Sequence, residues 1–430
     1  MTPLLVPLHG IGSRQDLPLP FEYVLVGAAL ALAVSFVVLA FAWRSSRWTQ
    51  PPSGRPLAGF ARLVDHRATV WVLRIVVLVV WLTAGLALWF GQDRVTNPAF
   101  GFVYVWLWVG LVPLSLLAGP VWRRLNPVRT LLLGVRALPV LDGRVGRRAL
   151  PSGLGVWPGA LALVGFLWLE LVQPGNNSLP VLQAWAAAWF AWSFGGALVW
   201  GEAWLAAADP FEVVSTLVGR LSPWRRAAGR VRWVNPLHKL AAGPHPAGSA
   251  AVVVVLLGGT AFDSFGATTG WIRLVQTSDL SPVLWGTAGL LGMIALVAAT
   301  FSLGVRGLPS DVLAASVVPI VVGYTLGHYL SLLVLEGQRT AILLSDPLGV
   351  GWNLFGTAEA GISQLWLENP TATALVQLVA IVGGHLLGVL VAHDLAIGRL
   401  PARRTVTGQV PLLLVMVGYT VGGLTLLFSP

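Results

Sequence analysis

The chain has 430 residues, of which 56% are hydrophobic and only 10% are charged, whereas a soluble domain has about 25% charged residues. Its net charge of +10 raises the question of a nucleic-acid partner, and its lack of cysteine excludes disulfides and thiolate metal sites. A composition this apolar predicts an integral membrane protein rather than a soluble one.

Ten apolar segments of about 20 residues, each long enough to cross a bilayer, follow one another along the chain. They predict an all-α, polytopic membrane protein with about ten transmembrane helices in a single domain, residues 1–430. The N-terminal segment lacks the basic region and cleavage site of a signal peptide, so the first span is expected to remain. The predicted spans are 22–43, 69–90, 100–119, 154–172, 181–204, 248–265, 282–303, 312–334, 372–393 and 409–428.

The basic residues alternate with the predicted spans. Of the 27 Lys and Arg residues, 22 lie in segments on one side of the membrane and only four lie on the other. The positive-inside rule then predicts a multi-pass plasma-membrane protein with cytoplasmic basic loops and both termini outside the cytoplasm. Because the Arg residues are scattered among these loops, no nucleic-acid partner is expected. The basic segments are 44–68, 120–153, 205–247, 304–311 and 394–408.

Pairs of Asn or Asp followed by Pro recur along the chain, and they are typical of helix starts. We therefore expect Asp209, Glu212 and Asp346 to act mainly as helix caps. The segments 127–138 and 210–221 are expected to lie along the cytoplasmic face as amphipathic helices. The six pairs begin at Asn97, Asn126, Asp209, Asn235, Asp346 and Asn369.

Three histidines, His328, His385 and His393, lie on predicted spans, where a titratable side chain is costly and usually faces protein or water. His328 is in the eighth span and His385 in the ninth, each beside a glycine pair spaced four residues apart. Such pairs let helices approach closely, so these two helices are expected to be neighbours. The glycine pairs are Gly323 with Gly327 and Gly384 with Gly388.

Further polar residues extend this pattern across the membrane. Glu336 is expected at the outer mouth of the bundle, and His393 and Asp394 at the inner one. Spread over that depth with His328 and His385, they suit a proton or ion relay better than one shared metal site. The alternative is that each histidine bonds a backbone carbonyl or a hydroxyl and holds helices together.

Other carboxylates occur near the predicted ends of spans. Asp263, at the outer end of the sixth span, lies between two phenylalanines and needs a partner there. Glu170 and Glu202 end the fourth and fifth spans and are expected to reach headgroup water. The segment 335–371 is the only long outer loop, and it is apolar enough to cover an outward-facing cavity.

Six stretches of the chain resemble a family of polytopic actinobacterial membrane proteins, some of which are labelled fenitrothion hydrolase, an organophosphate triesterase activity. The resemblance implies a hydrolase that uses one or two metal ions to generate a hydroxide nucleophile. Its ligands on the outer side would be His9, Asp263, His328 and Glu336. The stretches are HGIGSRQDLPLP (9–20), GLVPLSLLAGPVWRRLNPVRTL (110–131), AFDSFGATTGW (261–271), GHYLSLLVLEGQ (327–338), SDPLGVGWNLFGTAE (345–359) and VAHDLAI (391–397).

Three functions therefore remain open. The first is a transporter or permease that moves a small solute or ion past protonatable groups on the eighth and ninth helices. The second is a membrane-embedded hydrolase, for which alone a divalent metal cofactor is expected. The third is a non-catalytic subunit with a membrane-protein partner, or a homo-oligomer. No soluble-enzyme motif is present in the sequence.

Overall fold

The computed structural model describes residues 14–48, 50–139, 145–227, 230–401, 404 and 406–428. The regular secondary structure of this part of the chain is almost all helical, as predicted, with one small antiparallel sheet. The sheet has the strand order β1-β3-β2 and pairs Arg55 with Trp233 and Trp224 with Trp233. Its strands are β1 (Arg55–Pro56), β2 (Trp224–Ala227) and β3 (Arg230–Trp233).

Seven of the described helices are long and apolar enough to cross a membrane, and a bent helix pair makes an eighth candidate. The pair joins α4 (Pro98–Phe100) and η2 (Gly101–Val109) to α5 (Leu111–Ala118) at an angle of 41°. Two further predicted spans are helical, namely the 15-residue α8 (Trp157–Leu171) and the less hydropathic α9 (Leu179–Trp200). The seven are α1 (Phe21–Ala42), α3 (Arg67–Phe90), α13 (Ser249–Gly266), α15 (Pro282–Gly304), α16 (Ser310–Leu343), α18 (Pro370–Ile397) and α19 (Val410–Phe428) with the turn η5 (Thr407–Gln409) before it.

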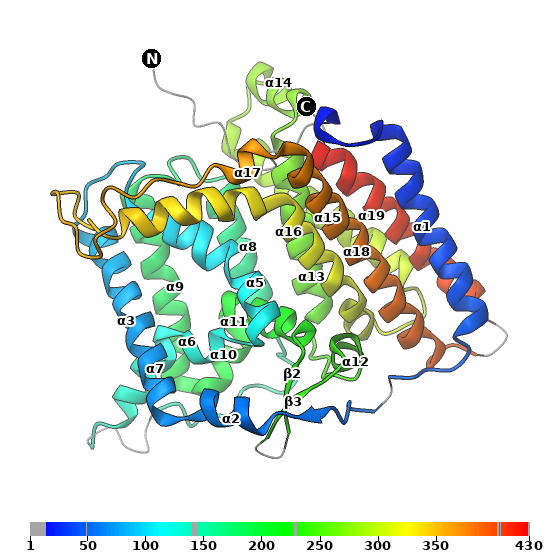
Figure 1. Cartoon of the computed structure of the whole chain (residues 1–430), viewed down its shortest axis with the longest axis horizontal. Coiled ribbons are helices and arrows are strands. Elements are labelled where there is room, and N and C mark those ends of the chain that lie inside the picture. The colour runs from blue at the N-terminus through cyan, green and yellow to red at the C-terminus, as the bar shows by residue number, and fades with distance from the viewer. Residues whose placement is uncertain are drawn as a thin grey trace.

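Shorter elements gather at the two ends of the bundle (Figure 1). At one end lie α2 (Ala58–Asp65), α7 (Pro127–Arg136), α12 (Pro236–Ala241), β2 and β3. At the other lie α14 (Thr269–Thr277) and α17 (Leu365–Glu368), where α1 begins and α19 ends. The remaining short helices are η1 (Arg14–Asp16), α6 (Trp122–Leu125), α10 (Glu202–Ala208), α11 (Pro210–Val218) and η3 (Gly219–Leu221).

Helices α16 and α18 cross at their glycines, as predicted. A Cβ on Gly323 would lie 2.3 Å from the Ala380 carbonyl oxygen, and one on Gly384 would lie 2.5 Å from the Pro319 carbonyl oxygen. Only glycine allows this approach. The helix of the eighth predicted span continues beyond residue 334, since α16 extends to Leu343 and occupies the start of the expected outer loop.

The expected helix starts are mostly confirmed. The side chains of Asn97, Asn126, Asp209 and Asn235 each accept a hydrogen bond from a first-turn amide. Asn369 precedes α18 but donates to the Leu365 carbonyl instead. The prediction for Asp346 is wrong, because its carboxylate accepts hydrogen bonds from the amides of Val350 and Gly351 in a loop. The four caps are therefore local sequence signals that fold as expected.

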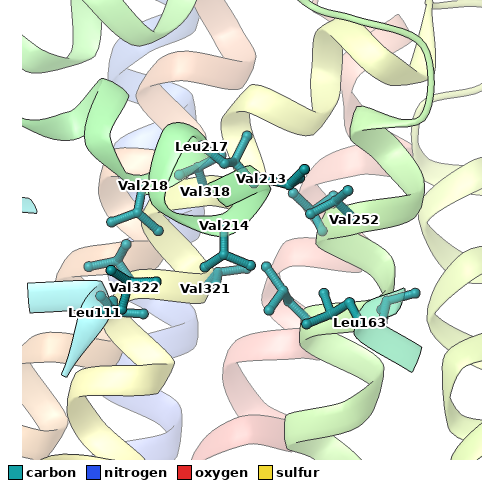
Figure 2. Packing of buried hydrophobic residues seen from close by; sticks show 14 of the residues in the cluster. Leu111, Leu163, Val213, Val214, Leu217, Val218, Val252, Val318, Val321 and Val322 are labelled. Carbon is teal, nitrogen blue, oxygen red and sulfur yellow. The ribbon is translucent and has the colours of Figure 1, made fainter. Parts of the chain in front are cut away.

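The expectation that 210–221 lies on the cytoplasmic surface is wrong. Apart from Thr216, every residue of α11 is buried. Figure 2 shows Val213, Val214, Leu217 and Val218 of α11 among side chains of α16, α13, α8 and α5. A helix this apolar gains more from packing on four neighbours than from lying in the headgroup layer. The labelled partners are Val318, Val321, Val322, Val252, Leu163 and Leu111.

The starts of α7 and α11 face each other through paired polar side chains. Asn126 Nδ2 donates to Asp209 Oδ2 over 3.1 Å, so the two cap residues bond one another. Arg129 donates to both carboxylate oxygens of Glu212 over 2.8 and 2.6 Å, and its Nη1 lies 2.7 Å from Glu202. Glu212 was expected to complete a capping box, but its carboxylate instead binds Arg129. This arrangement joins two short helices inside the protein.

Candidate functional site

A buried cluster of polar side chains lies where α13 meets α16. His328 Nε2 is 3.1 Å from Asp263 Oδ2, and the Tyr329 hydroxyl donates to the same oxygen over 2.7 Å. The side chain of His328 is 5% exposed and that of Asp263 is 14% exposed. The histidine and the carboxylate that the sequence separates by 65 residues thus form one pair. We refer to Asp263, Ser264, Tyr324, His328 and Tyr329 as the His328 cluster.

Tyr324 and Ser264 also contact the imidazole of His328. Tyr324 stacks on His328 with ring centroids 5.5 Å apart, and its hydroxyl is 2.6 Å from Ser264 Oγ. Ser264 Oγ is in turn 3.5 Å from His328 Nδ1, at the limit of a hydrogen bond. Both imidazole nitrogens therefore face polar atoms of α13. Such a ring can exchange a proton at either nitrogen.

The cluster lies toward the outer end of the bundle, since Asp263 is three residues before the end of α13, and it is covered on that side. At about 1.5 Å per residue, Asp263 is roughly 21 Å along α13 from its first residue, and His328 roughly 27 Å along α16. The indole of Trp366 in α17 donates to Ser331 Oγ over 3.0 Å, three residues from His328. Part of the segment 335–371 thus packs over the outer end of the site, in the position expected for a cover.

Glu170, at the end of α8, is an unexpected neighbour of the cluster. Its carboxylate interacts electrostatically with Asp263 and with the Tyr329 hydroxyl. Its Oε2 is buried and has no hydrogen-bond partner within the described part of the chain. The expectation that Glu170 reaches headgroup water is therefore wrong. Glu170 thus lies near the carboxylate that pairs with His328.

The residues considered as metal ligands do not converge. Glu336 is eight residues beyond His328, about 12 Å along the helix, and its carboxylate is 2.8 Å from Arg339. Among the residues described, no group of three or more His, Asp or Glu side chains could hold a metal ion. His9 lies outside the described residues. Of the proposed ligand set, the structure brings only Asp263 and His328 together.

His385 lies close to the crossing of α16 and α18 but not in the His328 cluster. Its Nδ1 is 2.8 Å from the Ile381 carbonyl of its own helix, and its Nε2 is buried without a partner in the described ranges. Gly323 contacts Gly384, so His328 lies about 9 Å nearer the outer side than His385, at about 1.5 Å per residue. No hydrogen bond between described residues joins these two histidines directly.

His393 and Asp394 anchor the start of a loop at the basic end of the bundle. His393 is 2.9 Å from Gln409 Oε1 and 3.0 Å from the Trp43 carbonyl. Asp394 accepts from Trp43 Nε1, from the Ser46 hydroxyl, and from the amides of Arg47 and Trp48 over 2.6 to 3.3 Å. Both side chains are buried. Their contacts fix the chain that follows α1, and the predicted relay through them stays a prediction.

Sequence analysis identified His328 and Asp263 separately, placed Glu170 at headgroup water, and did not single out Ser264, Tyr324 or Tyr329. The two tyrosines flank His328 in the run GYTLGHYL, one turn before it and directly after it. Hydroxyl groups this close to a histidine inside an apolar span were the available signal. No protein-family model, curated protein or solved structure matches the chain.

Proposed function

We propose that the chain is a membrane transporter that moves a small solute or ion, and that the His328 cluster is its proton-binding centre. The observation that carries this proposal is the buried pair of His328 and Asp263 between two membrane-spanning helices. Ionisable groups buried inside a membrane protein are costly, and they commonly mark a path for ions or substrates. A purely structural contact between α13 and α16 needs no titratable pair.

The proposed mechanism uses a proton at the His328 imidazole. Protonation gives His328 a positive charge that Asp263 balances, and loss of the proton leaves a neutral ring bonded to the carboxylate. The Tyr329 hydroxyl keeps a bond to Asp263 in both states. Glu170, with a buried oxygen free of hydrogen bonds in the described residues, offers a second position for a proton or a cation. The solute would move when these charges change.

The proposed topology has ten transmembrane helices in the plasma membrane, with the basic loops in the cytoplasm. In support, all ten predicted segments fall on helices, and the Arg-bearing elements α2, α7, β2 and β3 lie at one end of the bundle. Both termini would then lie outside the cytoplasm, as would the cover formed by α17. The bilayer and a small solute or ion are the partners that this function requires.

Proton entry into proteoliposomes tests the proposal. The protein is reconstituted into vesicles loaded with the pH dye pyranine, with K⁺ and valinomycin to hold the potential at zero. An inward proton gradient is imposed while sugars, amino acids, carboxylates or inorganic cations are added in groups. We expect one group to change the rate of proton entry, because solute and proton share one site.

Two variants and a matched control identify the residues responsible. His328→Gln and Asp263→Asn each replace a titratable group of the pair with an amide. Both should therefore abolish the solute-dependent change in the rate of proton entry. His66→Gln, at the exposed start of α3, should leave it unchanged. Equal rates in the wild type and His328→Gln would contradict the proposal. Stoichiometric zinc or manganese with triester hydrolysis would favour the hydrolase instead.

A further inference from the structure

A groove of about 770 Å³ runs beside the crossing of α16 and α18, away from the His328 cluster. Its walls come from α16, α18, α5, η3 and the segment that joins β3 to α12. The lining includes no charged side chain, and Asn235 is its only amide. On the α18 wall, Val379 is 67% exposed and Leu387 is 40% exposed. The groove is therefore open at the surface that the membrane surrounds.

Glycines create the hollow. Gly323 and Gly384 bring the two helices into contact, and they leave no side chain at the crossing. Gly383 also lines the groove, and a Cβ added there would meet no atom within 4 Å. Of these three glycines, only Gly383 has empty space where a side chain would lie, because Gly323 and Gly384 are in contact with the facing helix. The volume lies within the range of about 300–1,000 Å³ that is typical of small-molecule sites.

The groove reaches from the basic end of the bundle to its middle. Gly323 and Gly384 are each 13 residues from the basic end of their helix, which is about 20 Å at 1.5 Å per residue. The hydrocarbon core of a bilayer is about 30 Å thick. An acyl chain that enters at Asn235 and ends near Gly323 therefore reaches from the basic end into the middle of the hydrocarbon core.

The basic end of the groove carries the features of a membrane interface. Trp233 lines the groove and is half exposed, as expected of an interfacial tryptophan. Arg55 lies directly opposite Trp233 in the sheet, so their side chains share one face. Arg55 and Arg230 are both exposed, and residues 224–233 contain four Arg and no acidic residue. This end attracts an anionic group.

We propose that the groove binds an anionic glycerophospholipid from the leaflet at the basic end. One acyl chain lies beside the crossing of α16 and α18, against Gly323 and Gly383, and the phosphate lies against the face that carries Arg55. The apolar lining excludes a charged solute from the groove, and the Arg residues at its mouth select a negative headgroup. This site is separate from the proton-binding centre, and its occupant is held rather than transported.

Native mass spectrometry of the full chain tests the site. Protein purified in detergent is mixed with 1-palmitoyl-2-oleoyl phosphatidylglycerol or with the phosphatidylcholine of the same chains. We expect one bound phosphatidylglycerol per chain, and weaker retention of phosphatidylcholine. Arg55→Gln should lower the affinity for phosphatidylglycerol about fivefold, since a cation near an anionic surface contributes about that factor.

Substitutions that fill the groove locate the acyl chain. Gly383→Phe places a ring in the hollow without a backbone clash, and it should remove the bound phosphatidylglycerol. Gly418→Phe is the control: this exposed glycine of α19 also has open space around its Cβ and lies outside the groove. Val379→Trp against Leu414→Trp, at residues 67% and 65% exposed, repeats the comparison if Gly383→Phe fails to fold.

Two results would overturn the proposal. If the groove-filling variant retains phosphatidylglycerol as well as its control does, the acyl chain does not occupy the groove. If the wild type binds phosphatidylcholine as tightly as phosphatidylglycerol, the basic end does not select the headgroup. Proton entry is not measured here, so either result is distinguishable from failure of the transport proposal.

Discussion

The buried ion pair between Arg129 and Glu212 gives a sharp prediction about stability. Glu212 is fully buried, and Arg129 binds both of its oxygens. Each charge-assisted hydrogen bond contributes about 1.5–3 kcal/mol, and removal of one partner of a buried pair costs about 3–5 kcal/mol. Arg129→Met should therefore lower the free energy of unfolding by about 3–5 kcal/mol. It leaves Glu212 with Arg123, which is 3.5 Å away and half exposed.

The partner variants make this a double-mutant cycle. Glu212→Leu should cost less than Arg129→Met, because Arg129 keeps its contact with the half-exposed Glu202. The double variant leaves neither charge buried alone, so the two changes should couple by about 2–3 kcal/mol. Unfolding by SDS in mixed micelles, followed by tryptophan fluorescence, measures these values.

An exposed ion pair supplies the control for this cycle. Arg339 is 47% exposed and pairs with Glu336 within one helix. Arg339→Met should cost less than about 1 kcal/mol, as exposed pairs do. The reasoning about burial is refuted if Arg129→Met lowers the free energy of unfolding no more than Arg339→Met does. It is also refuted if the effects of Arg129→Met and Glu212→Leu are additive in the double variant.

Three further predictions concern stability and local order. Burial raises the pKa of Asp209 to about 7, so the folded chain holds a proton that the unfolded chain releases near pH 4, and stability should fall as pH rises from about 4 to 7. Asp209→Asn should flatten this slope; an equal slope in both proteins would contradict it. Gly323→Ala should destabilise the α16–α18 crossing by about 1–3 kcal/mol in the same SDS titration, whereas Gly383→Ala should change stability by less than about 1 kcal/mol. If Gly323→Ala and Gly383→Ala lower stability equally, close packing of α16 and α18 is not the cause of the loss. Asp394→Ala should release the segment 43–48 and speed its cleavage by trypsin, and an unchanged digestion pattern would show that Asp394 does not hold it.

The helices were predictable because hydropathy is a local property of the chain. The Asx-Pro caps were predictable for the same reason, since cap and amide lie within four residues of each other. The burial of α11 was not predictable from the sequence. Its amphipathic pattern indicated a surface helix, and the partner that makes Glu212 compatible with the interior lies 83 residues earlier, in α7. The end of α16 was missed because tertiary contacts such as Trp106 with the Gly337 carbonyl support its last turns.

The site was predictable in part. A histidine in an apolar span can be recognised from the sequence because its burial costs free energy. Asp263 could be recognised for the same reason, since it lies beside two phenylalanines. Their pairing depends on how α13 and α16 rotate against each other, which no local pattern specifies. Glu170 shows the same limit: it looks like a helix end at the headgroups, and only the packing of α8 places it beside Asp263.

The central claim is that His328 and Asp263 bind the proton that drives transport. Pyranine-loaded proteoliposomes of wild type, His328→Gln and His66→Gln test it most directly, with one solute group added at a time under an inward proton gradient. The account predicts that a solute changes proton entry in the wild type and His66→Gln, and that His328→Gln shows no such change. Solute-dependent proton entry at the wild-type rate in His328→Gln would contradict it.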